Sequence, residues 1–167
     1  DHLLPLLEHE NPFVREGALH ILRRLNQPDY ADTVLHILKH ERVGRVRKAC
    51  FQALQHLGDE NHNIIAIEYL RDSDLEVQAE ATVFLYTRGG IEGVLGGAEH
   101  LKKLLNSQDP VELNAVAQIM GAIGIRYFRK DFLTLLESPW PEVRKTCLAA
   151  AGLSPEPSLM PVLFRCL

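Results

Sequence analysis

The chain has 167 residues, of which 46% are hydrophobic and only 7% aromatic, so its core must consist mainly of Leu, Ile, Val and Ala. It carries 18 basic against 22 acidic residues, and this net charge of -4 argues against a general nucleic-acid binder, which normally has a basic excess. No stretch approaches the roughly 18 uncharged apolar residues of a membrane span, so we expect no direct membrane insertion of this segment. The composition favours a soluble, all-α protein.

One pattern recurs five times along the chain and predicts helical hairpins. An apolar pair is followed by a short polar break and then by a second apolar segment, with small or apolar residues at steps of four and eight that share one helical face. The second segments begin around Val14, Val46, Val77, Leu113 and Val143, and the small residues four positions later are Ala18, Cys50, Ala81, Ala117 and Cys147. Because small residues let two helices approach closely, we interpret Cys50 and Cys147 as packing residues rather than reactive thiols.

The recurrences divide the chain into units of 30 to 36 residues, which is enough for two helices of about 11 residues and their turns. The predicted units, in chain order, are 3–25, 31–57, 63–88, 99–124 and 130–153, followed by a half unit over 157–167. Second helices are expected to start at the capping pairs Asn11-Pro12 and Asp109-Pro110, after Asp74, and at Pro141, because these residue types favour the first turn of a helix.

The longest spacing contains a glycine-rich insertion over residues 89–98. Its glycines match neither GxGxxG nor a loop that ends in GK[ST], so a phosphate-binding loop is not indicated. We interpret this segment as a lengthened connection, with room for a short helical turn over 91–95, that changes the angle between repeats or acts as a hinge.

The hairpins with Val14-Arg15, Val46-Arg47 and Val143-Arg144, together with the acidic break over 70–74, resemble HEAT repeats. They are most similar to the short bacterial variety called phycobilisome-lyase-type. The resemblance extends from Leu3 to Leu167 and implies one array, a right-handed α-α superhelix (α-solenoid) of about five hairpins plus one extra helix. It also implies that the arginines pair with acidic or carbonyl groups in the break of the neighbouring repeat. Gln78 and Asn114 replace this arginine in the third and fourth units.

The chain begins almost inside a helix and stops after the first helix of a sixth unit. A first helix without its second helix leaves apolar surface uncovered, whereas the ends of a repeat array need polar outer faces. We therefore expect the chain to be a fragment of a longer protein.

Candidate sites for chemistry are few. Asp32, His36 and His40 share one helical face, but three residues along a straight helix do not enclose a tetrahedral ion, so a solvated face is expected rather than a metal site. The sequence has no GxSxG motif, and its serines lie at turns or caps. We assign no catalytic residue and no cofactor, and we predict that the chain is not an enzyme.

A basic cluster occupies the start of the second unit's second helix, where the helix dipole disfavours positive charge. Compensation is expected either from Glu41 or from an acidic partner. The cluster consists of Arg42, Arg45, Arg47 and Lys48.

The predicted function is a protein–protein interaction or scaffolding module that binds a protein partner on the concave face lined by second helices. The candidate partner surface consists of Arg15, Arg47, Lys48, Gln78, Asn114 and Arg144. One alternative is a soluble regulatory HEAT domain of a larger bacterial membrane protein, because residues 132–144 and 93–100 are similar to HEAT segments fused to nucleotide-transporter-like proteins. A second alternative is a bilin-lyase-like enzyme, because HEAT-like arrays include bilin lyases. The expected location is cytoplasmic, and the partner and the oligomeric state stay open.

Overall fold

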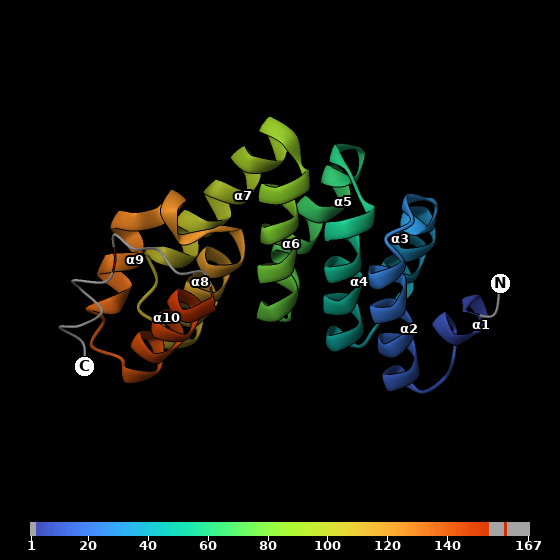
Figure 1. Ribbon diagram of the computed structural model, residues 1–167, viewed down its shortest axis with the longest axis horizontal. Helices are drawn as coiled ribbons and strands as arrows, with labels where there is room; N and C mark the ends of the chain where they lie inside the picture. Colours follow the sequence, from blue (N-terminus) through green and yellow to red (C-terminus); the bar gives the residue numbers. More distant parts are fainter. Residues whose placement is uncertain (1–2, 154–158, 160–167) are drawn as a thin grey trace. The chain divides into compact units, whose positions relative to one another are not determined.

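The computed structural model describes residues 3–153 and residue 159, and in this part of the chain the regular structure is helical throughout, without strands (Figure 1). The expected half unit over 157–167 lies outside the described residues, apart from Leu159. The ten α-helices of the described part are α1 (Leu4–Leu7), α2 (Pro12–Leu25), α3 (Ala31–His40), α4 (Gly44–Leu57), α5 (Asn63–Glu68), α6 (Leu75–Arg88), α7 (Gly90–Leu105), α8 (Pro110–Ile123), α9 (Arg129–Leu136) and α10 (Pro141–Leu153). The all-α prediction is confirmed.

The second helices begin where their capping residues predict. The side chains of Asn11, Asp74 and Asp109 each accept a hydrogen bond from the backbone N–H two residues later, at 2.8 to 2.9 Å. Each such bond satisfies one of the N–H groups that the first turn of a helix leaves without a partner. Pro12, Pro110 and Pro141 occupy the first position of their helices, where a missing N–H costs nothing.

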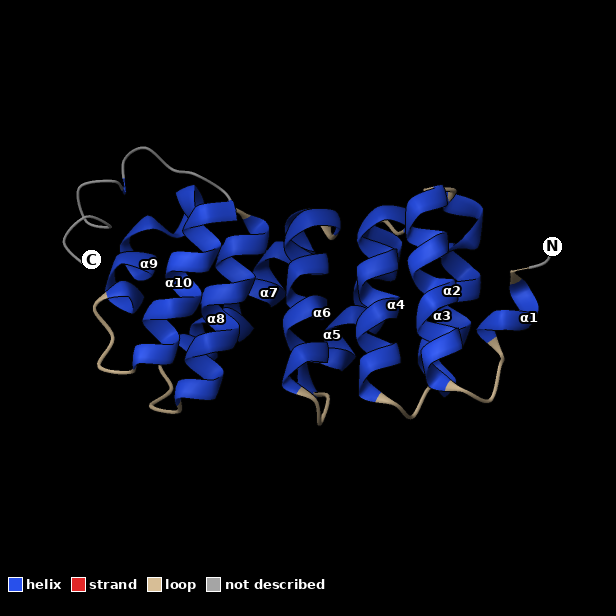
Figure 2. Ribbon diagram, turned by 60° about the horizontal axis from the view of Figure 1, so that its bottom comes forward, coloured by secondary structure: helices blue, strands red, loops and turns tan. Residues whose placement is uncertain are grey.

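The chain divides into two compact units, Asp1–Ala98 and Glu99–Leu167. In the first unit, α2, α4 and α6 lie side by side in chain order, and α3 and α5 pack behind α4 and α6 (Figures 1 and 2). Each hairpin therefore contacts the next through its second helix, as in an α-solenoid.

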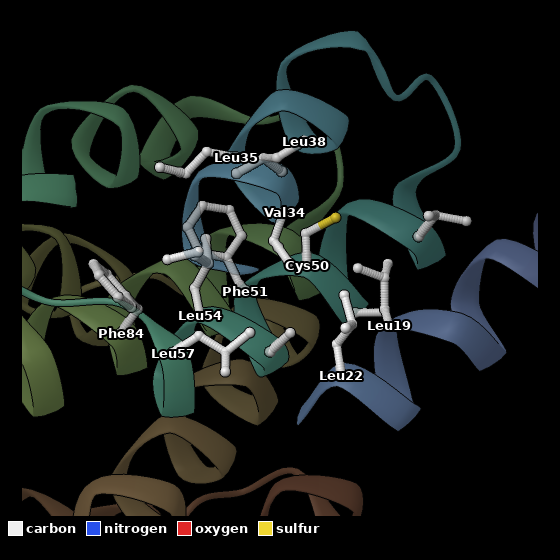
Figure 3. Packing of buried hydrophobic residues seen from close by; sticks show 14 of the residues in the cluster. Leu19, Leu22, Val34, Leu35, Leu38, Cys50, Phe51, Leu54, Leu57 and Phe84 are labelled. Atoms are coloured by element: carbon white, nitrogen blue, oxygen red, sulfur yellow. The ribbon is translucent and has the colours of Figure 1, made fainter. Parts of the chain in front are cut away.

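The core of the first unit lies between these two layers of helices (Figure 3). Ala18, Cys50 and Ala81 are at most 2% exposed, which confirms that the small residues of the repeat are packing residues. The Phe51 ring lies between two other aromatic rings, with centroids 5.4 Å from Tyr69 and 6.4 Å from Phe84.

In the second unit, α8 packs along α10, and α9 contacts both helices. Gly121 lies at the α8–α10 crossing, where a Cβ atom on this residue would come within 2.8 Å of the Ala150 Cβ. Any larger residue at position 121 would therefore hold these helices apart.

The glycine-rich segment is helical, so the interpretation as a lengthened connection is wrong. Residues 90–98 form the first part of α7, and only Gly90, with φ +58°, has a conformation that favours glycine. A Cβ on Gly93 would come within 2.8 Å of the Leu85 carbonyl oxygen, and one on Gly97 would lie 3.0 Å from the Tyr86 ring. The glycines therefore let α7 pack closely against the end of α6.

Candidate functional site

Arg15 of α2 connects the first hairpin to the second. Its Nε and Nη2 atoms donate to the two carboxylate oxygens of Glu41 at 2.7 and 2.9 Å, and its Nη1 donates to the carbonyls of His9 and Glu10. The Glu41 carboxylate also accepts from the Val43 N–H and is 5% exposed. Burial alone would raise the pKa of Glu41, but the hydrogen bonds from Arg15 and Val43 outweigh it and hold this pKa below its ordinary value.

Arg47 of α4 repeats this arrangement between the second and third hairpins. It donates to both oxygens of Asp72 at 2.8 and 2.7 Å and to the Arg42 carbonyl at 2.8 Å. The Asp72 carboxylate is 6% exposed and also accepts from the Asp74 N–H. Each arginine thus bonds the turn of its own hairpin and a carboxylate in the break of the next, as the resemblance implies.

At the equivalent positions of the third and fifth hairpins, the described partners belong to the residue's own turn. Gln78 donates to the Asp72 carbonyl at 2.6 Å, and Arg144 donates to the carbonyls of Ser138 and Pro139. Asn114 differs, because its Oδ1 is buried without a hydrogen-bond partner among the described residues. Of the six residues of the expected partner surface, four therefore have donors engaged in turns.

The remaining candidate, Lys48, lies on the face formed by α2, α4 and α6. Its ammonium group pairs with Glu76 of α6 at 2.8 Å, and both side chains reach solvent. Other polar contacts join the same helices: Arg45 to Glu16 at 2.6 Å, and Gln52 and Gln55 to Glu80 at 2.6 and 2.7 Å.

Three members of the basic cluster, Arg45, Arg47 and Lys48, are compensated by acidic residues, but not by Glu41, which pairs with Arg15. Glu16 pairs with Arg45, Asp72 with Arg47, and Glu76 with Lys48. The compensation therefore comes from the neighbouring hairpins on both sides, which the linear sequence could not reveal.

The histidine face of α3 contributes to an open hollow of about 430 Å³ beside the Arg15–Glu41 pair. The His36 and His40 rings lie 4.6 Å apart, and the His40 Nδ1 atom bonds the His36 carbonyl at 2.8 Å. No group of three side chains with metal-ligand geometry occurs within the described part of the chain.

The thiols of Cys50 and Cys147 are fully buried. Burial raises the pKa of Cys147 to about 12 and that of Cys50 further still. Both groups stay protonated at neutral pH and are therefore poor nucleophiles.

Large aliphatic side chains are exposed on α5 and on the first part of α7, and sequence reasoning missed them. These two helices are in contact, since a Cβ on Gly96 would lie 3.6 Å from the Ile67 side chain. The α5–α7 aliphatic patch consists of Ile64, Ile67, Ile91, Val94 and Leu95, which are 75, 43, 82, 36 and 66% exposed. The spacing of Ile91, Val94 and Leu95 would have revealed an apolar helix face if the segment had been recognised as helical.

Comparison with known proteins gives one family match. The family model for HEAT repeats matches residues 1–55, which contain the first hairpin and most of the second. This confirms the HEAT-repeat resemblance there, and with the hairpin packing it identifies an α-solenoid, a class of stacked helical repeats.

No curated protein matches the chain. Among solved structures, a crystal structure of an engineered protein from the Northeast Structural Genomics Consortium is 20% identical, with a TM-score of 0.49, and the match covers 91% of this chain and 77% of that chain. No helix within residues 3–153 is long and apolar enough to cross a bilayer.

Proposed function

We propose that this chain is a non-catalytic protein-interaction module whose partner docks on the α5–α7 aliphatic patch. The observation that carries this proposal is the exposure of five large aliphatic side chains on two helices that contact each other. Ile91 and Leu95, four residues apart, share one face of α7, and an exposed apolar helix face is typical of an interaction site. The HEAT-repeat match adds general support, because stacked repeats offer extended binding surfaces.

The charge around the patch favours a basic partner. Residues 58–98 contain eight acidic residues and only two basic ones. Three exposed acidic residues, Glu60, Glu68 and Glu92, belong to the same helices or the turn before them and make no ion pair with any described residue. Complementary charge steers association, so the proposed occupant is an amphipathic helix of another protein with Lys or Arg beside its apolar face.

A second contact is proposed on the face of the second helices, which we expect to be concave, with Lys48 at its centre. In the first unit, Arg15, Arg47 and Gln78 hold the turns beside this face. The corresponding positions of the second unit, Asn114 and Arg144, are proposed to contribute a contact of their own. The buried, protonated thiols support a non-catalytic role, and two free cysteines fit a reducing, cytoplasmic location.

The proposal is tested with a model amphipathic peptide of Leu and Lys, and with a Leu and Glu peptide of the same length. The Leu/Lys peptide should bind saturably, as measured by fluorescence anisotropy. Leu95→Glu should weaken binding about tenfold, because burying most of one leucine contributes about 1 to 2 kcal/mol. Ile21→Glu is the matched control, since it changes another half-exposed aliphatic residue on α2.

Equal binding of the two peptides would contradict a basic partner. Equal weakening by Leu95→Glu and Ile21→Glu would contradict the location of the site.

A further inference from the structure

A second hollow, of about 580 Å³, lies at the ends of α2 and α4, on different residues from the aliphatic patch. Its lining residues are His20, Arg23, Arg24, Asn26 and His56. None of the five is acidic, although the chain has more acidic than basic residues. Asn26 ends α2 in the left-handed conformation (φ 51°), and its backbone N–H donates to the Leu22 carbonyl.

The positive charges of this hollow are poorly neutralised. Arg23 donates its Nε hydrogen to the Nε2 atom of His56 at 3.2 Å, which requires that this ring nitrogen carry no proton. Arg24 makes no ion pair or hydrogen bond with any side chain in the described part of the chain. The positive charge of an arginine that faces a histidine instead of a carboxylate is poorly compensated.

Glu16, one turn before His20 on α2, is already engaged. His20 Nε2 lies 3.9 Å from one oxygen of Glu16, and the other Glu16 oxygen pairs with Arg45 at 2.6 Å. Glu16 therefore offers little compensation to the two arginines.

The elements packed against His56 make its surroundings positive. Burial lowers the pKa of His56, and the charges of Arg23 on α2 and Arg88 on α6 lower it further. Arg88 donates to the Gln55 carbonyl, and the nearby acid of α6, Glu80, accepts from Gln52 and Gln55. A bound anion would reverse this effect, because it would stabilise the protonated imidazole.

The helix dipole explains only part of this cluster. Basic residues in the last turn of a helix interact favourably with its negative end, and Arg23, Arg24 and Lys39 all occupy such positions. The dipole does not explain why Arg23 and His56, two groups that repel each other when both are charged, converge on one hollow. Lys39 occupies such a position on α3 but does not line this hollow, so it provides a natural control.

We propose that this hollow binds a phosphate group. Two guanidinium groups present planar, multiple donors that match phosphate oxygens, and the two imidazoles add donors when they are protonated. A phosphate monoester carries between one and two negative charges at neutral pH and has three acceptor oxygens, so it satisfies several of these donors at once. The site is independent of the aliphatic patch, and either one can fail without the other.

The test is an NMR titration of the 167-residue chain with inorganic phosphate at constant ionic strength. The His56 ring signal should shift saturably, and its pKa should rise as phosphate binds. A rise of one unit corresponds to tenfold tighter binding by the protonated form, so affinity should increase as the pH falls toward the lowered pKa of His56.

Matched variants localise the effect. Arg24→Gln removes an exposed charge and should weaken phosphate binding at least tenfold, whereas Lys39→Gln, the same type of change in the last turn of α3, should leave it unchanged. A phosphoserine peptide serves as the second ligand: tighter binding than inorganic phosphate would mean that a protein segment carries the group, and equal binding would indicate a free phosphate.

Three results would overturn the proposal. They are an equal shift of His56 with chloride in place of phosphate, equal weakening by Lys39→Gln and Arg24→Gln, and the absence of any saturable shift.

Discussion

The Arg47–Asp72 pair provides a direct test of what holds successive hairpins together. Arg47→Met keeps most of the aliphatic stem but removes three hydrogen bonds, two of them to Asp72. The Asp72 carboxylate, 6% exposed, would keep the Asp74 N–H as its only described donor. Leaving a buried charge without its partner costs about 3 to 5 kcal/mol, and we expect a value near the lower limit because some solvent reaches the pair.

A comparison with Arg144 separates the stability contributed by the carboxylate partner from that contributed by the carbonyls of the turn. Arg144→Met removes bonds to two backbone carbonyls but leaves no described carboxylate unpaired. Its expected cost is therefore only about 1 kcal/mol. Arg15→Met should resemble Arg47→Met, since Arg15 has both kinds of partner.

Urea denaturation followed by far-UV circular dichroism and by the fluorescence of Trp140 is the appropriate assay. Trp140 lies in the second unit, so a loss of stability confined to the first unit should shift the dichroism transition more than the fluorescence transition. The double variant Arg47→Met/Asp72→Leu should regain all but about 1 kcal/mol of the free energy of unfolding that Arg47→Met loses, because no buried charge is left without a partner. Additive costs of the two single substitutions, or equal costs for Arg47→Met and Arg144→Met, would refute the reasoning.

Three further predictions address acid, packing and thiol reactivity. A carboxyl whose pKa is lowered by folding contributes stability above its unfolded pKa and loses it as the pH falls through the folded value. In Arg15→Met the pKa of Glu41 is raised, because the hydrogen bonds of Arg15 no longer offset burial, so in pH-dependent urea titrations the cost of this substitution should be largest at pH 7 and should shrink as the pH falls and Glu41 is protonated. Gly93→Ala should destabilise the chain by about 1 to 3 kcal/mol because its Cβ meets the Leu85 carbonyl, whereas Gly17→Ala, with no atom within 4 Å of the added Cβ, should stabilise it by up to about 1 kcal/mol in thermal unfolding. In a Cys166→Ser background, Ellman's reagent at pH 8 should react with Cys50 and Cys147 only after denaturant is added, and rapid reaction in the native state would contradict their burial.

Local signals predicted most of the fold. Capping by Asn11, Asp74 and Asp109 depends on residues within one turn, so the starts of these helices could be read from the sequence. The helix α7 begins at Gly90, whereas the sequence pattern indicates a connection between hairpins in the glycine-rich segment. Glycine has a low helix propensity, so these glycines did not suggest a helix. They occur here because α7 packs closely against α5 and α6, and such a contact between helices cannot be read from the local sequence.

The candidate site could be predicted only in part. The pairing of the arginines followed from the repeat, but their carboxylate partners lie 25 or 26 residues away, and only the stacking of hairpins brings them together. The same stacking engages hydrogen-bond donors that the sequence pattern assigned to a partner surface. The sequence pattern assigned no role to Ile91 and Leu95, and the structure shows that both side chains are exposed.

The ion pairs between hairpins leave charge uncompensated at two places in the first unit. Arg15, Arg47 and Lys48 pair with acids of the following hairpin, and Arg45 pairs with Glu16 of the preceding one. Among the described residues, these pairs do not include Arg23 and Arg24 of α2, or Glu68 and Glu92 beside the aliphatic patch. The positive hollow and the acidic, apolar surface lie on different helices of the first unit, so the two proposed sites should select ligands of opposite charge.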